Sequence, residues 1–152
     1  MSGGQPSDPA AVSQSRFSAR KGHELITYQN RLWLIGGFEA GLQNDIWSSS
    51  NGEIWKQENS AAFNTCIYNH QLIIDTNSKI RLIGGLISSS TLDPNIYVCP
   101  ASPWGAQTVL PGFGKRADHQ ISTFNGQHWL TGGSTGPSSV NTLYTADTWS
   151  SP

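Results

Sequence analysis

Three evenly spaced glycine pairs constrain the fold of this chain more than any other feature. They are Gly36-Gly37, Gly84-Gly85 and Gly132-Gly133, so successive pairs lie 48 residues apart. Each pair ends a short apolar run. A fixed period of this length indicates an array of one supersecondary unit. The sequence therefore predicts a repeat architecture.

The first repeat contains short β-type runs separated by turn residues. Such a pattern predicts a four-stranded antiparallel meander. Two turns are expected at Gln29-Asn30 and at Asn51-Gly52, where Asn-Gly supplies the positive φ angles of a tight hairpin. The four runs cover residues 25–28, 32–37, 44–47 and 54–55.

The third repeat matches the first closely. His23 and His119 each stand 13 residues before the first glycine of their pair, and Trp33 and Trp129 each stand three residues before it. An Asn125-Gly126 turn separates the two strands of the third repeat. The matched spacing predicts that the two tryptophans lie on matching faces of their strands.

The middle repeat departs from this pattern. His70 lies 14 residues before its glycine pair, which places one extra residue in the hairpin at 76–79. Ile67 stands where the flanking repeats have arginine, and Arg81 stands where they have tryptophan. A site built identically from all three repeats is therefore not expected.

These motifs together resemble the kelch repeat. The resemblance rests on Arg-x-x-His at 20–23 and 116–119, an apolar strand ending in Gly-Gly, and later aromatic residues. The stretch at 45–52 is similar to bacterial kelch-type sequences, and the resemblance covers about residues 16–152. It implies an all-β fold in which each repeat is one four-stranded blade of a β-propeller.

The resemblance also suggests how the chain divides. Residues 1–15 are expected to be a flexible polar segment, followed by blades at about 16–60, 61–110 and 111–152. The last blade is predicted to be incomplete under either of two alignments. One places residues 147–152 over 45–50, and the other places 141–144 over 44–47.

Three blades are fewer than the roughly four to eight of a closed propeller. Apolar faces are therefore expected at both ends of the array. Two chains could form a six-bladed homodimer, in which residues 10–17 complete a last blade. The chain could instead be a fragment of a longer propeller, or a self-sufficient stack of three sheets.

Arg20 and Arg116 precede the innermost strand of their repeats. In kelch domains that bind acidic peptides, arginines here face the central funnel, so the resemblance implies bidentate contact with ligand carboxylates. The alternative is that they pair with nearby acids such as Asp118, or with loop carbonyls.

The loops after the glycine pairs supply the other candidate binding residues. Phe38 and Glu39 follow the first pair, and Leu86 and Ile87 follow the second. Variable loops on a rigid scaffold often carry recognition. The alternative for Leu86 and Ile87 is burial under a neighbouring loop.

The histidines and cysteines do not predict a metal or cofactor site. His23, His70 and His119 occupy one repeated position, where hydrogen bonds to the backbone are expected, and no close ligand pair supports a metal. Cys66 and Cys99 are too few for a disulfide framework and are expected to be buried thiols in strands. The tryptophans are expected to fill the space between blades, although aromatic faces can also stack on sugars.

The predicted function is non-catalytic binding of a protein or peptide. A net charge of −1 and 12% charged residues give no reason to expect nucleic acid or membrane partners. No catalytic motif is present. The alternatives are a carbohydrate-binding module, or a fragment of a kelch-type enzyme similar to galactose oxidase or sialic acid epimerase. No signal peptide or transmembrane segment is seen, so a cytoplasmic location is the default and a secreted origin stays open.

Overall fold

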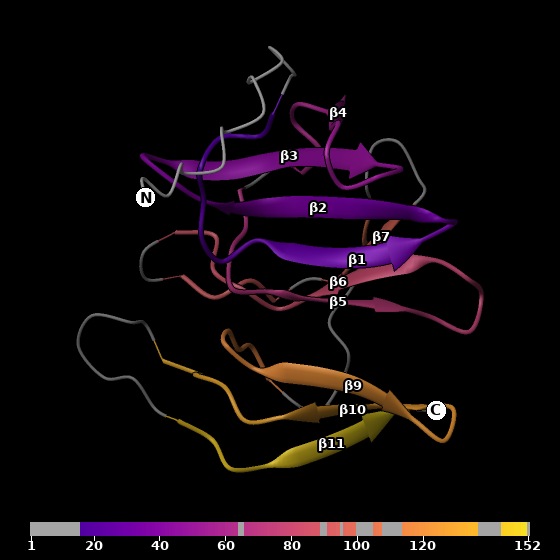
Figure 1. Cartoon of the computed structure of the whole chain (residues 1–152). Coiled ribbons are helices and arrows are strands. Elements are labelled where there is room, and N and C mark those ends of the chain that lie inside the picture. The colour runs from indigo at the N-terminus through magenta and orange to yellow at the C-terminus, as the bar shows by residue number, and fades with distance from the viewer. Residues whose placement is uncertain are drawn as a thin grey trace, which may run out of the picture.

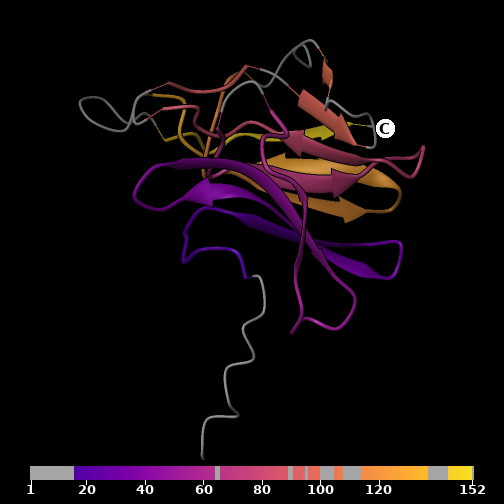
Figure 2. The same cartoon turned by 90° about the horizontal axis from the view of Figure 1, so that it is seen from above.

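The chain folds into three antiparallel sheets that follow one another in chain order (Figures 1 and 2). This computed structural model describes residues 16–63, 66–88, 91–94, 96–99, 105–107, 114–136 and 144–151. The all-β class is confirmed. No helix that could cross a membrane occurs among these residues.

The first sheet has the predicted four-stranded meander. Its strands are β1 (Glu24–Tyr28), β2 (Arg31–Phe38), β3 (Leu42–Ser49) and β4 (Lys56–Asn59), in that order. Gln29 and Asn30 both have positive φ, as the expected tight turn requires. The tight hairpin predicted at Asn51-Gly52 is wrong. Residues 50–55 form a longer loop, because the Asn51 carboxamide accepts hydrogen bonds from the Glu53 and Ile54 amides.

The second sheet has the same order of strands, β5 (Gln71–Ile74), β6 (Ile80–Ile83), β7 (Ile96–Cys99) and β8 (Gly105–Gln107). The extra residue falls in the β5–β6 loop, where the Asp75 carboxylate accepts hydrogen bonds from the Asn77 and Lys79 amides. Arg81 also donates to Asp75, at 2.6 Å. Cys66 precedes this sheet and lies outside the strands, contrary to the prediction, whereas Cys99 ends β7.

The third sheet contains β9 (Gln120–Phe124), β10 (Gln127–Thr131) and β11 (Thr148–Ser151), with β10 in the middle. Leu130 pairs with Trp149 as Leu34 pairs with Trp47 in the first sheet. The register therefore follows the alignment of 147–152 with 45–50, and the alternative alignment is wrong.

The sheets stack through one set of apolar positions. Ile26, Ile35 and Ile46 of the first sheet face Leu72, Leu82 and Tyr97 of the second. Ile73, Ile83 and Ile96, on the other face of the second sheet, pack against Ile121 and Leu130 of the third. Each sheet thus turns one face to the sheet before it and the opposite face to the sheet after it.

The third sheet does not have the apolar end face that the sequence argument anticipated. At the positions equivalent to Ile26, Ile35 and Ile46, it carries exposed Ser122, Thr131 and Thr148. Polar outer faces are typical of terminal repeats in stacked proteins. These three positions of the third sheet are therefore hydrophilic.

The outer face of the first sheet is apolar but covered. Leu34, Trp47 and Trp55 are buried there, and Phe17 packs on them. The Phe17 ring meets Trp55 edge to face at a centroid distance of 5.0 Å. Phe17 therefore occupies the face on which another sheet would otherwise stack.

Replacing Phe17 by alanine is expected to lower the free energy of unfolding by about 2 kcal/mol. The reason is that Leu34 and Trp47 lose their cover, while the half-buried Phe17 loses its own contacts. Urea unfolding followed by circular dichroism measures the change. Arg16→Ala, at the exposed neighbouring residue, is the matched control and should fall within about 0.5 kcal/mol of the parent. Equal effects of the two substitutions would contradict the covering role.

Candidate functional site: an aromatic pair on the loop surface

Arg20 is buried inside its own sheet. Its guanidinium donates to both carboxylate oxygens of Asp45, at 2.5 and 3.1 Å, and to the Gly36 carbonyl oxygen at 2.9 Å. Burial raises the pKa of Asp45, but hydrogen bonds from Arg20 and Trp47 and the charge of Arg20 outweigh it, so the pKa is lowered. The pair ties the approach to β1 to strand β3.

Arg116 repeats this arrangement in the third sheet. It donates to the two carboxylate oxygens of Asp147 at 2.8 and 2.9 Å, and to the Gly132 carbonyl oxygen at 2.8 Å. Hydrogen bonds from Arg116 and Trp149 hold the pKa of Asp147 well below its usual range. Asp118, suggested by the sequence as a partner, is not the acid that either arginine contacts.

The two arginines therefore have a structural role. Their side chains are only 1% and 2% exposed, and a ligand carboxylate would have to compete with Asp45 and Asp147 for the same donors. Ligand contact through Arg20 and Arg116 stays a prediction.

The middle sheet has no arginine at the corresponding position. Ile67 stands at the arginine position and is buried in the apolar core. Asp93 is also buried, and it accepts a hydrogen bond from the Tyr97 hydroxyl at 2.8 Å. The loss of arginine thus coincides with a phenol in place of tryptophan on strand β7.

The repeated histidines join neighbouring sheets. His70 and His119 are buried, and neither ring nitrogen of either residue has a hydrogen-bond partner among the described residues. The predicted hydrogen bonds to the backbone are therefore wrong for these two. Their rings pack over Gly36 and Gly84 of the preceding sheet, where a glycine Cβ would lie 3.3 and 2.7 Å from the respective Cε1 atoms.

The loop residues separate into buried and accessible sets. Leu86 is 4% exposed and packs with Leu92, Ala117 and Tyr68, so it is covered as the alternative anticipated. Ile87 is half-buried and bonded through its amide to the Thr91 carbonyl. Phe38 is half-buried and Glu39 is exposed. Of the four predicted loop residues, Glu39 is thus exposed, Phe38 and Ile87 are half-buried and Leu86 is buried.

Phe38 forms an aromatic pair with Tyr68 of the second sheet. The ring centroids lie 5.5 Å apart with the planes tilted by 42°. The Lys21 ammonium lies 5.7 Å from the Phe38 centroid. Burial and then the negative charge of Asp118 raise the pKa of Tyr68. We call the patch of Lys21, Phe38, Glu39, Tyr68 and Asp118 the loop surface.

Backbone hydrogen bonds link the three sheets next to the loop surface. The Asn69 amide donates to the Gly22 carbonyl at 2.8 Å, and the Asp118 amide donates to the Asn69 carbonyl at 3.1 Å. All three residues have positive φ. Because these residues adjoin Lys21, Tyr68 and Ala117, these hydrogen bonds fix side chains from three sheets relative to one another.

Sequence reasoning missed Lys21, Tyr68 and Asp118 as members of this surface. A signal was present, because Lys21 and Tyr68 each stand two residues before the repeated histidine of their unit. The repeat therefore places them at equivalent points on neighbouring sheets. The spacing alone does not show that Phe38 turns toward Tyr68.

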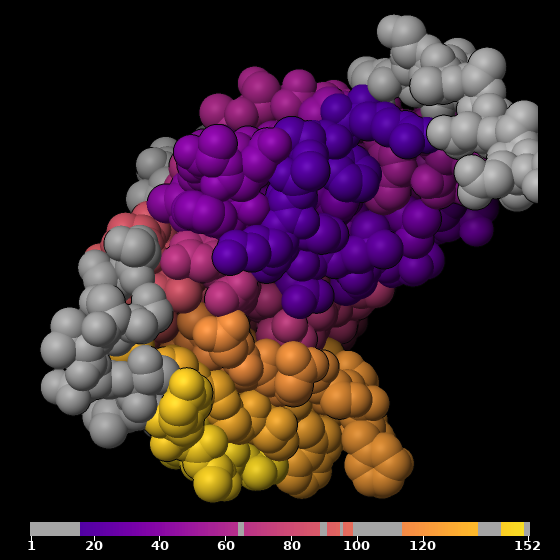
Figure 3. Space-filling model, turned by 60° about the vertical axis from the view of Figure 1, so that its left-hand side comes forward, coloured from indigo at the N-terminus to yellow at the C-terminus, as the bar shows by residue number. Residues whose placement is uncertain are grey.

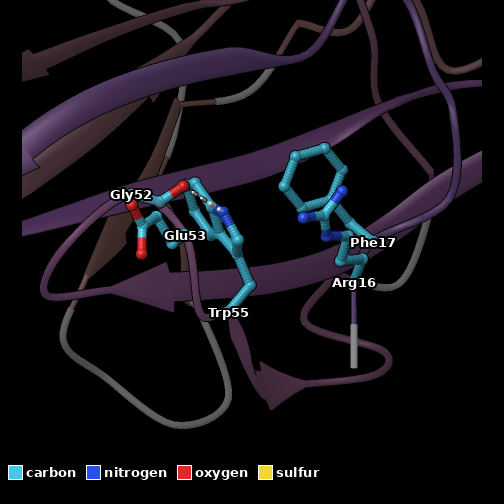
Figure 4. Close-up of a pocket in the computed structure, with 5 residues that line it drawn as sticks. All are labelled: Arg16, Phe17, Gly52, Glu53 and Trp55. Atoms are coloured by element: carbon cyan, nitrogen blue, oxygen red, sulfur yellow. Dashed lines mark hydrogen bonds between the residues drawn. The ribbon is translucent and has the colours of Figure 1, made fainter. Parts of the chain in front are cut away.

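A concavity lies on the outer face of the first sheet (Figure 4). It is an open hollow of about 410 Å³ lined by Arg16, Phe17, Gly52, Glu53 and Trp55. Trp55 is 8% exposed, and its indole N–H donates to the Gly52 carbonyl at 3.0 Å. The aromatic side chains that line the hollow therefore cover the sheet. The hollow lies between residues 16–17 and the β3–β4 loop.

Among the described residues, no three His, Cys, Asp or Glu side chains lie close enough together to hold a metal ion. Comparison with known proteins adds no assignment: neither a protein-family model nor a curated protein matches the chain.

Proposed function

We propose that the chain is a non-catalytic kelch-type binding module that takes a protein or peptide on the loop surface. The observation that carries the proposal is the half-exposed Phe38–Tyr68 pair. Aromatic residues are enriched among the residues that dominate the energy of protein interfaces. Loops held by rigid sheets are the usual position for such residues.

The charges around the pair give the site polarity. Lys21 lies over Phe38 at 5.7 Å, and the Asp118 amide is bonded to the carbonyl of Asn69, the residue after Tyr68. A ligand with an apolar side chain flanked by charges of both signs would match this order. Because the arginines are paired internally, Lys21 replaces them as the cation that faces an acidic group of the ligand.

A binding function fits the described residues better than a catalytic function, for a chemical reason. In the described residues, His70 and His119 are buried between sheets and Arg20 and Arg116 are paired, so neither set faces a common open site. Acid–base catalysis needs such groups within reach of a substrate.

Selection of a phage-displayed library of random dodecapeptides on the immobilised protein tests the proposal. Enriched peptides should bind Phe38→Ala and Tyr68→Ala about tenfold more weakly than the parent, because each substitution removes half of the aromatic pair. Tyr68 also contacts Leu86, so thermal unfolding of that variant must be checked alongside.

Thr76→Ala is the matched control for this selection. Thr76 is exposed on the β5–β6 hairpin, outside the loop surface, and its substitution should leave peptide affinity unchanged. Failure to enrich any peptide would refute the proposed function. Peptides that bind both aromatic variants as well as the parent would refute the site.

A further inference from the structure

The open face of the third sheet has an unusual composition. We call it the end face. It is the face of β9, β10 and β11 that points away from the second sheet, at one end of the molecule (Figures 1 and 3). By strand register it presents Gln120, Ser122, Phe124, Gln127, Trp129, Thr131, Thr148 and Ser150. None of these side chains is charged.

Hydroxyl and amide groups form regular rows on the end face. Ser122, Trp129 and Ser150 are in register across the three strands, and Gln120, Thr131 and Thr148 form the next row. All of these except the half-buried Trp129 are exposed. Such groups both donate and accept hydrogen bonds. The rows therefore offer a grid of neutral donors and acceptors.

Trp129 lies in the middle of this grid. Its indole N–H donates to the Phe124 carbonyl at 3.4 Å, as Trp33 donates to the Tyr28 carbonyl in the first sheet at 3.1 Å. Trp33 packs against the second sheet, whereas no described residue of a further sheet covers Trp129. Phe124, which is 64% exposed, adds a second aromatic side chain at the edge.

The end face is poorly suited to a further sheet or a second copy. Stacking elsewhere in the molecule uses isoleucine at three positions, and these are Ser122, Thr131 and Thr148 here. Burying three hydroxyl groups against an apolar sheet would cost free energy without new hydrogen bonds. The face instead combines an aromatic side chain with dense neutral hydrogen-bonding groups.

From this arrangement we infer that the end face binds a neutral oligosaccharide or polysaccharide. Sugar rings present an apolar C–H face that can pack on the indole of Trp129, and hydroxyl groups that can bond to the surrounding Ser, Thr and Gln side chains. Neighbouring strands lie about 4.8 Å apart, close to the length of one pyranose residue, so a glycan laid along a row meets one strand after another. The absence of charge on these eight side chains favours a neutral glycan. This site is independent of the loop surface.

Isothermal titration with cellohexaose, laminarihexaose, chitohexaose and mannohexaose tests the inference, with oligogalacturonate as the charged contrast. At least one neutral hexasaccharide should bind the parent protein. Trp129→Ala should weaken that binding about tenfold by removing the stacking surface. Thr148→Asp should weaken the binding similarly by placing a charge among the rows. Because Thr148 is exposed, this variant should still fold.

Thr76→Asp introduces the same charge at an exposed residue far from the end face and should bind like the parent. The inference is overturned if no neutral hexasaccharide binds, if only oligogalacturonate binds, or if both end-face variants bind with unchanged affinity. Light scattering gives the molar mass in solution as a further test. A dimer of twice 16.5 kDa that Thr148→Asp converts to a monomer would show that the end face binds a second copy, and it would overturn the inference.

Discussion

The free energy of unfolding is expected to fall by about 4 kcal/mol when the pH is lowered from 7 to 5. The cause is the pair of histidines buried between the sheets. Burial, then the positive charges of His119 and His23, lowers the pKa of His70 to about 3. Burial and the charge of Arg116 lower the pKa of His119 to about 4.

The direction follows from proton uptake by the unfolded chain. An unfolded histidine binds a proton below a pH of about 6.5, whereas the folded protein holds both rings neutral until the pH approaches their lowered pKa values. Between these limits the unfolded state binds more protons, so stability decreases as the pH falls. Each histidine contributes about 2 kcal/mol at pH 5. Asp45 and Asp147, whose pKa values are lowered, lose their stabilising effect only at more acidic pH.

Urea titrations at a series of pH values measure this slope. His70→Gln and His119→Gln should each be less stable at pH 7, and each should lose about half of the pH dependence between pH 7 and 5. His128→Gln is the control, because His128 is only half-buried and its ring contacts the hydroxyl of exposed Thr123 at 3.0 Å. If both buried-histidine variants kept the pH dependence of unfolding free energy seen in the parent protein, other groups would be the cause of the acid sensitivity.

The sequence predicted the repeat well because the repeat is enforced by the backbone. The glycine pairs adopt positive φ in all three units, and the turns at Gln29-Asn30 and Asn125-Gly126 do so as well. These conformations depend on residue type at a single position, so one chain is enough to recognise them. Strand order then follows from short connections.

The contacts between units were harder to predict because they depend on which side chain a neighbouring sheet supplies. Arg20 could be placed before the first strand, but its pairing with Asp45 joins residues 25 apart through the sheet. The polar character of Ser122, Thr131 and Thr148 was visible in the sequence. Its meaning appears only when register places all three on one open face.

The aromatic pair of the loop surface shows the same limit. The position of Phe38 after a glycine pair predicts a binding residue, whereas the position of Tyr68 two residues before a repeated histidine does not by itself predict one. The bridges that join Lys21 to Phe38 and Tyr68 to Leu86 bring the loops of two sheets to one surface. Periodicity places these residues at equivalent positions of neighbouring sheets, but it does not determine which aromatic rings contact each other.

Replacing Gly84 by alanine is expected to lower the free energy of unfolding by about 3 kcal/mol or more. Gly84 has a φ of +64°, which costs an alanine about 1 kcal/mol. A Cβ there would also overlap the Arg116 carbonyl oxygen and lie 2.7 Å from His119 Cε1. The backbone oxygen cannot turn aside, since the same carbonyl accepts a hydrogen bond from Gly85 at 2.9 Å. The third sheet must therefore move away from the second.

Gly132→Ala separates the effect of stacking from the effect of the backbone. Gly132 has almost the same φ, +62°, but the nearest atom to its Cβ would be the Thr145 carbonyl oxygen at an ordinary 3.6 Å. Its substitution should cost only the backbone strain, about 1 kcal/mol. Urea unfolding of both variants gives the comparison. Equal losses of unfolding free energy in the two variants would show that the second glycine pair is not needed for close contact between the second and third sheets. The stacking of His119 on Gly84 would then not be the link between those sheets.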